Sequence, residues 1–213
     1  MNLVRVFVAT TEGPSEIQQI IKEDPEVRSV ICLNGTSEAL PVSRDYDSFV
    51  RKPTGVVERL LGHTSFRVDV SHSISNGQSW QLGLLAAHAV HAQERLAEHG
   101  DEADEVLWAT GEVRHNLDVA KVDHIREKIL KSEQLFLESI RNGRMLTLLV
   151  SDGNLEEIKA EFGKLGITGQ GISIRGLQSW SDFDVTPVPR ARRLPLWAAG
   201  LLLVVGLAGA AIF

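Results

Sequence analysis

The chain has 213 residues, of which 43% are apolar and 23% are charged, as is typical of one globular domain with a sizeable core. Its formal net charge of −6 offers no general attraction to nucleic acid, so we expect no nucleic-acid partner. The single cysteine, Cys32, excludes an intrachain disulfide and a cysteine-based metal site, and we expect it to be a buried core thiol.

The first half of the chain predicts a mixture of strands and short helices. Residues 2–10 alternate polar and apolar side chains as a strand does, and Gly13 with Pro14 introduces a predicted helix over 15–22. The apolar stretch 27–33 predicts a strand. A helix over 54–62 and a cleanly alternating strand over 66–70 follow.

The second half alternates helices and strands. Apolar residues at helical spacing predict a helix from Ser79 to about His99. After it, the patterns predict a strand over 104–113, one broken or continuous helix over 122–143, a strand over 145–150, a helix over 154–166 and a strand over 172–177. Because helices and strands alternate from residue 66 onward, we expect a layered α/β or α+β domain.

The C-terminal segment differs in composition from the rest. Residues 194–213 contain no charged side chain over 20 positions, enough at about 1.5 Å per residue to cross a hydrocarbon core about 30 Å thick. We therefore expect a single-pass transmembrane helix there, a Pro/Arg-rich linker over 185–193 and a globular domain over 1–184. The arginines of the linker, Arg190, Arg192 and Arg193, place that domain on the cytoplasmic side by the positive-inside tendency.

Ser79 stands where a turn passes into an apolar helix, in the stretch SNGQSWQLGLLAAHA. A serine at such a junction commonly caps the helix, because its hydroxyl accepts a hydrogen bond from a free amide of the first turn. The same position also suits a nucleophile, since a helix N-terminus offers free amides and partial positive charge to a developing oxyanion.

Three segments together resemble the proteolytic domain of Lon-type serine/lysine peptidases. In that family a loop of the form Asp-Gly-Pro-Ser-Ala-Gly opens a helix, a Thr-Gly-Glu strand follows, and a Gly-Gly-hydrophobic-x-x-Lys segment supplies a lysine. Here NGQSWQ contains Ser79, TGEV begins at Thr110, and DHIREKIL places Lys128 at the lysine position. The likeness covers roughly residues 60–177, because the later segment NGRMLTLLVSDGNLEEI also follows the family's order.

The resemblance implies an α+β fold of mixed sheets and packed helices, and a Ser-Lys dyad. Ser79 would be the nucleophile, Lys128 its neutral base, and Thr110 would accept a hydrogen bond that orients the lysine. Backbone amides of the serine turn, around Gly77, Gln78 and Trp80, would stabilise the oxyanion. Such a site uses no metal and no cofactor. The partners that it implies are a protein or peptide substrate and, as in ring-forming relatives, further copies of the chain.

The chain departs from the family's pattern beside the nucleophile and before the lysine. Trp80 and Gln81 replace small residues, which predicts bulk where a substrate strand would lie, and Asp123-His124 replaces the glycine pair. The sequence also contains no GxxxxGK[ST] loop for an ATPase motor. These features predict a membrane-anchored, ATP-independent peptidase that makes limited cleavages in a specific cytoplasmic protein. The alternative is a catalytically degenerate module that recruits a partner to the membrane.

Other interpretations of the same residues remain open at this point. Lys128 on its own is typical of a solvated helix lysine. His72 is a candidate base for Ser79, with Asp69 or Asp123 as its orienting acid. His88 and His91 lie three residues apart on one predicted helix, which fits either metal ligands or, more simply, a solvated face. A small-molecule kinase of the GHMP type is a third function, although SNGQS has a single glycine for cradling phosphate.

Overall fold

A computed structural model of the chain describes residues 2–74 and 77–183. The expected linker (185–193) and transmembrane helix (194–213) lie outside these residues, as does the last residue of the predicted domain, at position 184. Among the described residues, no helix combines the length and the apolar character needed to cross a bilayer.

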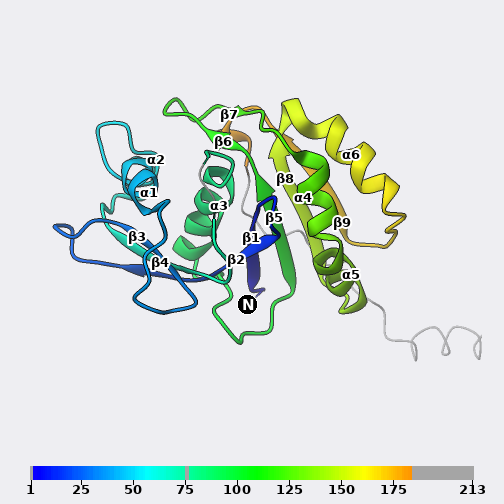
Figure 1. The fold of residues 1–213 in the computed structure, drawn as a ribbon, viewed down its shortest axis with the longest axis horizontal. Helices are drawn as coiled ribbons and strands as arrows, with labels where there is room; N and C mark the ends of the chain where they lie inside the picture. Colours follow the sequence, from blue (N-terminus) through cyan, green and yellow to red (C-terminus); the bar gives the residue numbers. More distant parts are fainter. Residues whose placement is uncertain (1, 75–76, 184–213) are drawn as a thin grey trace, which may run out of the picture.

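The described part of the chain folds as an α+β domain (Figure 1). Its strands are β1 (Val4–Ala9), β2 (Pro14–Lys22), β3 (Val30–Leu33), β4 (Phe66–Val70), β5 (Glu105–Thr110), β6 (Glu112–Val113), β7 (Val119–Ala120), β8 (Met145–Ser151) and β9 (Ile172–Leu177). Its helices are α1 (Ser43–Val50), α2 (Val56–Leu61), α3 (Gln81–Ala92), α4 (Ile125–Lys131), α5 (Glu133–Arg141) and α6 (Leu155–Lys164), with short 3₁₀ turns at Asp152–Asn154 and Trp180–Asp182.

Seven strands form one mixed sheet in the order β3-β4-β2-β1-β5-β8-β9. Strand β2 pairs antiparallel with both of its neighbours, whereas β1, β5, β8 and β9 run parallel. The carboxyl ends of β1 and β5 therefore reach the same edge of the sheet, which is where ligands bind in sheets with parallel strands. A two-stranded ribbon of β6 and β7 continues from β5.

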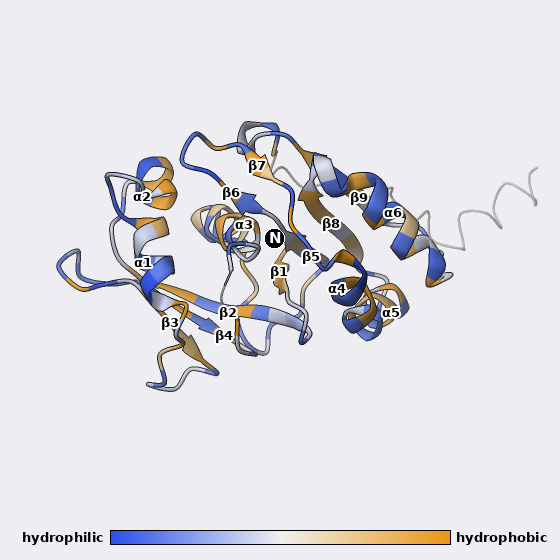
Figure 2. Cartoon of the chain, turned by 45° about the horizontal axis from the view of Figure 1, so that its top comes forward, coloured by the Kyte–Doolittle hydropathy of each residue, from blue (hydrophilic) through white to orange (hydrophobic). Residues whose placement is uncertain are grey.

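The central strands bury both faces, and each face has its own core. Val6 and Val8 of β1 belong to a cluster with α1, α2 and α3, whereas Phe7 and Ala9 face a second cluster with α4, α5 and α6. This alternation follows from the period of two in a strand. In Figure 2 the helices α4 and α6 show hydrophilic and hydrophobic sides, as expected when one side packs on the sheet.

The predicted helix over residues 15–22 is wrong, because this segment is the strand β2. Residues 10–13 form the turn of a hairpin between β1 and β2, in which the Thr10 hydroxyl donates to the Gly13 carbonyl at 2.7 Å. Ile17 and Ile20 reach the core on either side of a bulge between Ile17 and Gln19. That bulge breaks the alternation that identifies a strand in a sequence.

Two further boundaries differ from the prediction. Helix α3 ends at Ala92 and not near His99, since residues 94–97 turn back along β1, with Ala97 donating to the Val4 carbonyl at 2.9 Å. Gly111 divides the predicted strand 104–113 into β5 and β6. The helix over 122–143, expected to be broken or continuous, is broken at Ser132 into α4 and α5. Helix α1 and strand β7 were not predicted; α1 is a short amphipathic helix with Tyr46, Phe49 and Val50 buried.

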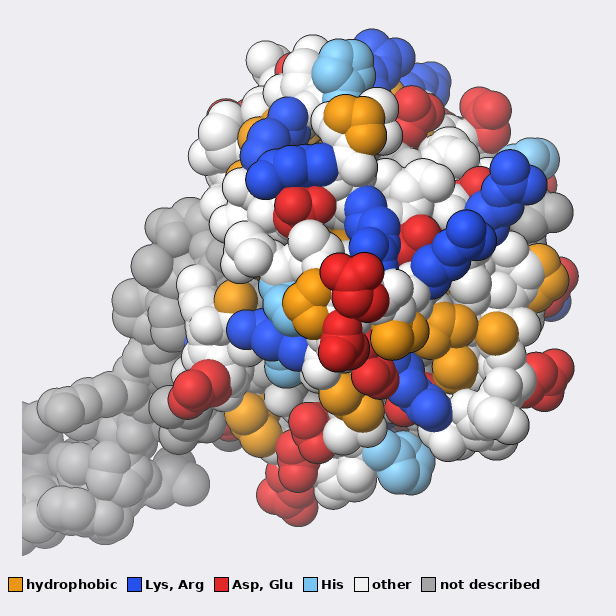
Figure 3. All heavy atoms as spheres, turned by 90° about the vertical axis from the view of Figure 1, so that its left-hand side faces the viewer, with side chains coloured by type: hydrophobic (Ala, Val, Ile, Leu, Met, Phe, Trp, Pro, Cys, Tyr) orange, Lys and Arg blue, Asp and Glu red, His pale blue; other side chains and the backbone are white. Residues whose placement is uncertain are grey.

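The side of the molecule that carries α1 and α2 presents basic and acidic side chains mixed with apolar ones (Figure 3). Ion pairs between neighbours, such as Arg51 with Asp47 at 3.0 Å, belong to α1 and its C-terminal end. Charges of both signs interspersed in this way produce no strong single-sign field over this face.

Candidate active site

The turn that carries Ser79 lies between β4 and α3. Helix α3 begins at Gln81, its N-cap residue is Trp80, and no side chain caps it. The interpretation of Ser79 as a helix cap is therefore wrong. The Ser79 side chain is half-buried, and its hydroxyl makes no hydrogen bond to another described residue.

Gly111 fixes the serine turn beside the end of β5. Its N–H donates to the Ser79 carbonyl and its own carbonyl accepts from the Leu82 N–H, both at 3.0 Å. A Cβ at this position would lie 2.9 Å from Cδ2 of Leu82, so the close approach requires glycine. Through these two hydrogen bonds, Gly111 keeps the turn that carries Ser79 close to its own neighbour Thr110.

Lys128 projects from α4 into the interior and is only 4% exposed. Its Nζ donates a hydrogen bond to Oγ1 of the fully buried Thr110 at 3.0 Å, which confirms the contact implied by the resemblance. Burial lowers the pKa of Lys128 from 10.5 to about 8, while the negative charges of Asp123 and Glu127 act in the opposite direction. The interpretation of Lys128 as a solvated helix lysine is therefore wrong.

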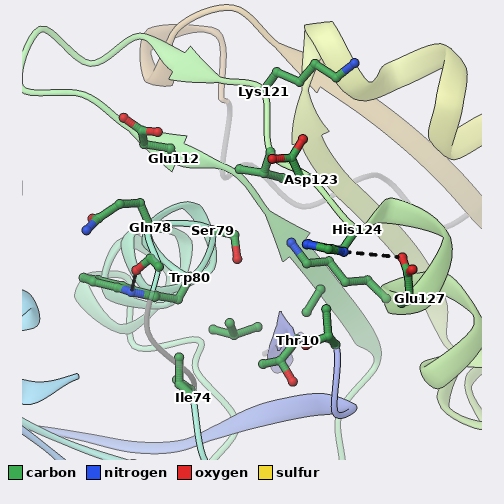
Figure 4. Close-up of a pocket in the computed structure, with 16 residues that line it drawn as sticks. Thr10, Ile74, Gln78, Ser79, Trp80, Glu112, Lys121, Asp123, His124 and Glu127 are labelled. Atoms are coloured by element: carbon green, nitrogen blue, oxygen red, sulfur yellow. Dashed lines mark hydrogen bonds and ion pairs between the residues drawn. The ribbon is translucent and has the colours of Figure 1, made fainter. Parts of the chain in front are cut away.

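Ser79 and Lys128 line the same cleft, which has a volume of about 600 Å³. Figure 4 shows Gln78, Ser79 and Trp80 along one side and Asp123, His124 and Glu127 along the other, with Thr10 and Ile74 below. The Ser79 hydroxyl and the Lys128 amine are not hydrogen-bonded to each other. Catalytic hydrogen bonds are often longer in a free enzyme than in its substrate complex.

Trp80 lines the cleft and Gln81 does not, and the bulk of both side chains is turned toward the protein interior. Trp80 is 1% exposed, and its ring packs edge-on against Tyr46 and Phe49 at centroid distances of 6.4 and 5.5 Å. The Gln81 amide turns toward the protein, where its Oε1 accepts from the Val113 N–H at 2.8 Å and its Nε2 donates to Gln78 Oε1. Both large residues therefore support the turn from behind.

The segment before Lys128 contains a residue in the left-handed backbone conformation, although no glycine occurs there. His124 has φ 62° and ψ 34°, in the region that glycine adopts most easily. A left-handed histidine next to a cleft is uncommon, and such residues are concentrated at functional sites.

The histidine alternatives are not supported. The ring of the exposed His72 lies 2.9 Å from the Ser71 hydroxyl, and His72 is not among the residues lining the cleft. Asp69, one candidate orienting acid, pairs instead with Arg67 at 3.0 Å.

The pair His88 and His91 does not form a metal site or a solvated face. No group of three or more metal-ligating side chains of the usual types occurs within residues 2–74 and 77–183. His88 is completely buried and its Nε2 lies 2.8 Å from the Tyr46 hydroxyl. It is therefore a core residue that joins α3 to α1.

Several cleft residues were not identified as part of a site from the sequence. Thr10 and Thr11 reach the cleft from the end of β1, and Glu112 and Glu127 lie on its rim. Glu112 and Glu127 lie within the TGEV and DHIREKIL segments, but the sequence pattern assigned neither of them a role. The threonines follow a strand more than 60 positions before Ser79, and nothing local connects the two segments.

Comparison of the chain with protein-family models finds no match, and comparison with curated proteins finds none either.

Proposed function

We propose that the domain is a Lon-like serine peptidase that cleaves peptide bonds through a dyad of Ser79 and Lys128. The observation that carries the proposal is the environment of Lys128, whose amine is buried, is hydrogen-bonded to Thr110 and lines the same cleft as Ser79. A lysine with a pKa of about 8 is about one-tenth neutral at pH 7 and mostly neutral above pH 8. Only the neutral amine can accept a proton from a serine hydroxyl.

The proposed reaction has two stages. Ser79 Oγ attacks the carbonyl carbon of the substrate while Lys128 Nζ accepts the hydroxyl proton, and a tetrahedral oxyanion forms. The intermediate expels the amine of the scissile bond, which takes the proton from Lys128, and an ester on Ser79 remains. Water then attacks the ester with Lys128 again as base, which releases the acid product and restores the serine.

Backbone amides of the serine turn would stabilise the negative charge of this intermediate. Gly77, Gln78 and Trp80 all line the cleft beside Ser79. Hydrogen-bond donors that are already fixed in place stabilise the oxyanion more than water does, because they need not reorient when the negative charge develops. Thr110 has a positioning role, since its Oγ1 holds the lysine amine without carrying a charge of its own.

The cellular role that we propose follows from the sequence beyond the site. The chain contains no phosphate-binding loop of an ATPase, and residues 194–213 have the composition of a membrane anchor. We therefore propose ATP-independent, limited cleavage of a cytoplasmic protein near the membrane. We also propose that copies of the chain assemble into a homo-oligomer. A catalytically inactive module that recruits a partner is the second candidate, favoured by the lack of a hydrogen bond between Ser79 and Lys128.

The test is labelling of the full-length chain, in detergent, with a fluorophosphonate that reacts with activated serines. We expect the label on Ser79, and we expect Ser79→Ala and Lys128→Met each to abolish it. His72→Ala is the control, because it removes the only other base proposed for this serine, and it should label at the normal rate. Complete lack of labelling of the folded wild-type chain would overturn the peptidase and leave the recruitment module.

A further inference from the structure

Three successive carbonyl groups of the serine turn each accept a hydrogen bond. The Gly77 carbonyl accepts from Nε1 of Trp80 at 2.6 Å, the Gln78 carbonyl from the Gln81 N–H at 3.1 Å, and the Ser79 carbonyl from the Gly111 N–H at 3.0 Å. The second and third of these donors are backbone groups. The first is a side chain, so this contact depends on the identity of residue 80.

The directions of these carbonyls determine the directions of the amides. In a trans peptide the C=O and the following N–H point to opposite sides. With the Gly77 carbonyl turned to the buried Trp80 indole, the Gln78 N–H points away from that indole. Neither the Gln78 N–H nor the Ser79 N–H donates to another described residue, and both residues line the cleft. Free amides aimed at a reacting centre are what an oxyanion requires.

Gln78 is held by Gln81 through its side chain and its own carbonyl, but among the described residues the Gly77 carbonyl accepts a hydrogen bond only from the Trp80 indole. Gly77 has φ 128°, a conformation that only glycine adopts readily, and a Cβ there would meet nothing within 4 Å. A glycine with open space around it permits rotation of the adjoining peptide at low cost. Trp80, in contrast, is immobilised by burial and by its edge-on contacts with Tyr46 and Phe49.

We propose that Trp80 is a positioning residue, whose indole N–H locks the Gly77–Gln78 peptide in the orientation that presents the Gln78 amide to the oxyanion. This inference rests on the proposed peptidase function of Ser79. It explains why a bulky residue is accommodated next to the nucleophile, since the ring packs into the core and only its N–H acts on the turn. Without that N–H, the peptide can rotate and place a carbonyl where the amide should be.

The test compares two buried tryptophans that differ in where their N–H groups point. Trp80→Phe keeps an aromatic ring in the core but removes the donor to Gly77. Trp108→Phe is the matched control, because Trp108 is also fully buried and its Nε1 donates to Ser132 Oγ at 2.8 Å, on the other face of the sheet. For each variant of the full-length chain we would measure the fluorophosphonate labelling rate constant of Ser79 across pH, the final extent of labelling and the melting temperature.

We expect Trp80→Phe to lower the labelling rate constant reached at high pH by at least about tenfold. This loss is smaller than the loss caused by complete removal of an oxyanion donor, because the Gln78 amide is still present. The final extent of labelling and the midpoint of the pH profile should be unchanged, since the folded fraction and Lys128 are not altered. Trp108→Phe should lower the melting temperature but leave the rate constant within about twofold of the wild-type value.

Labelling of Trp80→Phe at the wild-type rate would overturn the inference and leave the peptidase standing, whereas absence of labelling in the wild type would overturn both. If Trp80→Phe does not fold, benzothienylalanine at position 80 replaces the N–H by sulfur within a ring of the same shape. A tenfold loss with that residue supports the inference, and an unchanged rate contradicts it.

Discussion

The Lys128 side chain is subject to two opposing influences on its pKa. Burial lowers the pKa to about 8, and the carboxylates of Asp123 and Glu127 on the cleft rim limit the decrease. Both carboxylates are exposed, so solvent screens their effect. The pKa of the base is thus determined mainly by how deeply α4 places it, and is adjusted by charges at the surface.

The first prediction concerns the pH dependence of the reaction. Because Ser79 requires the neutral amine, the labelling rate constant should rise with pH with a midpoint near 8. Asp123→Asn removes a charge that raises the pKa, so its midpoint should fall by a few tenths of a pH unit. Asp101→Asn, which changes an exposed carboxylate that does not line the cleft, should leave the midpoint unchanged. A midpoint that moves upward in Asp123→Asn would contradict this assignment.

The second prediction concerns the stability cost of the same residue. The pKa of Lys128 is depressed in the folded state, so its favourable contribution exists above about pH 10.5 and is lost as pH falls through about 8. At pH 7 the folded protein therefore holds a buried ammonium. Lys128→Met should raise the free energy of unfolding at pH 7 by about 1 to 3 kcal/mol, measured by urea denaturation, while labelling is lost. Lys131→Met, which changes an exposed lysine on the same helix, should change the free energy of unfolding little. A lower free energy of unfolding in Lys128→Met would contradict the stability cost assigned to the buried amine.

At the scale of elements, α3 positions the serine turn by packing directly on the sheet and on α1. The contact with α1 is polar as well as aromatic, because Tyr46 hydrogen-bonds His88 in a fully buried setting and Nδ1 of His88 has no partner among the described residues. Burial lowers the pKa of His88 to about 3, and the nearby His91 adds to this effect. The neutral form of His88 is therefore part of the folded structure.

The third prediction is a loss of stability in acid caused by His88. Its folded pKa lies below the unfolded value of 6.5, so its contribution is complete above pH 6.5 and is lost as pH falls toward 3. Between pH 7.5 and pH 5 this residue should reduce the free energy of unfolding by about 2 kcal/mol. His88→Gln should remove that part of the pH dependence in urea titrations, whereas the exposed His115→Gln should retain it.

The fourth prediction tests how closely α3 approaches β1. A Cβ on Gly83 would lie 2.9 Å from Cγ2 of Val8, so Gly83→Ala should destabilise the fold by about 1 to 3 kcal/mol. Gly163 lies within α6, and nothing stands within 4 Å of its added Cβ. Gly163→Ala should therefore be neutral or stabilise by up to about 1 kcal/mol. Equal melting temperatures for the two variants would contradict the close contact.

For the whole molecule, the proposed function includes cleavage of a substrate but not the unfolding of that substrate. The chain has no phosphate-binding loop to power an unfoldase, and the cleft beside Ser79 must receive an extended segment. Substrates would therefore be cut only where their chain is already flexible or exposed.

The fifth prediction follows from that separation. The full-length chain in detergent should cleave an unstructured polypeptide, or the unstructured tail of a folded protein, and leave the folded part intact with or without ATP. Gel electrophoresis shows whether the folded part stays intact, and mass spectrometry of the fragments locates the cleavages in the unstructured part. Ser79→Ala is the control. Degradation of the folded part by the purified chain would show that an unfolding activity is present.

The sequence determined those features that depend on neighbouring residues. Alternation located β1, β4, β8 and β9, and helical spacing located α3, α4 and α6, because these patterns are local. The family resemblance, carried by the order of Ser79, Thr110 and Lys128, also implied the hydrogen bond between Thr110 and Lys128, which is confirmed. That prediction succeeded because it used three motifs in a fixed order. The local sequence around Lys128 alone predicts a lysine exposed to solvent.

Only the tertiary structure decided the features that depend on distant segments. Segment 14–22 is a strand because β1 and β4 pair with it on both sides, in spite of its interrupted alternation. Trp80 supports the serine turn from behind because α1 provides an aromatic pocket for its ring. The amine of Lys128 is buried because α4 packs on one face of the sheet, where the amine reaches Thr110 at the end of β5. Burial, and with it the pKa of a base, depends on which elements enclose a side chain, and local sequence does not encode that.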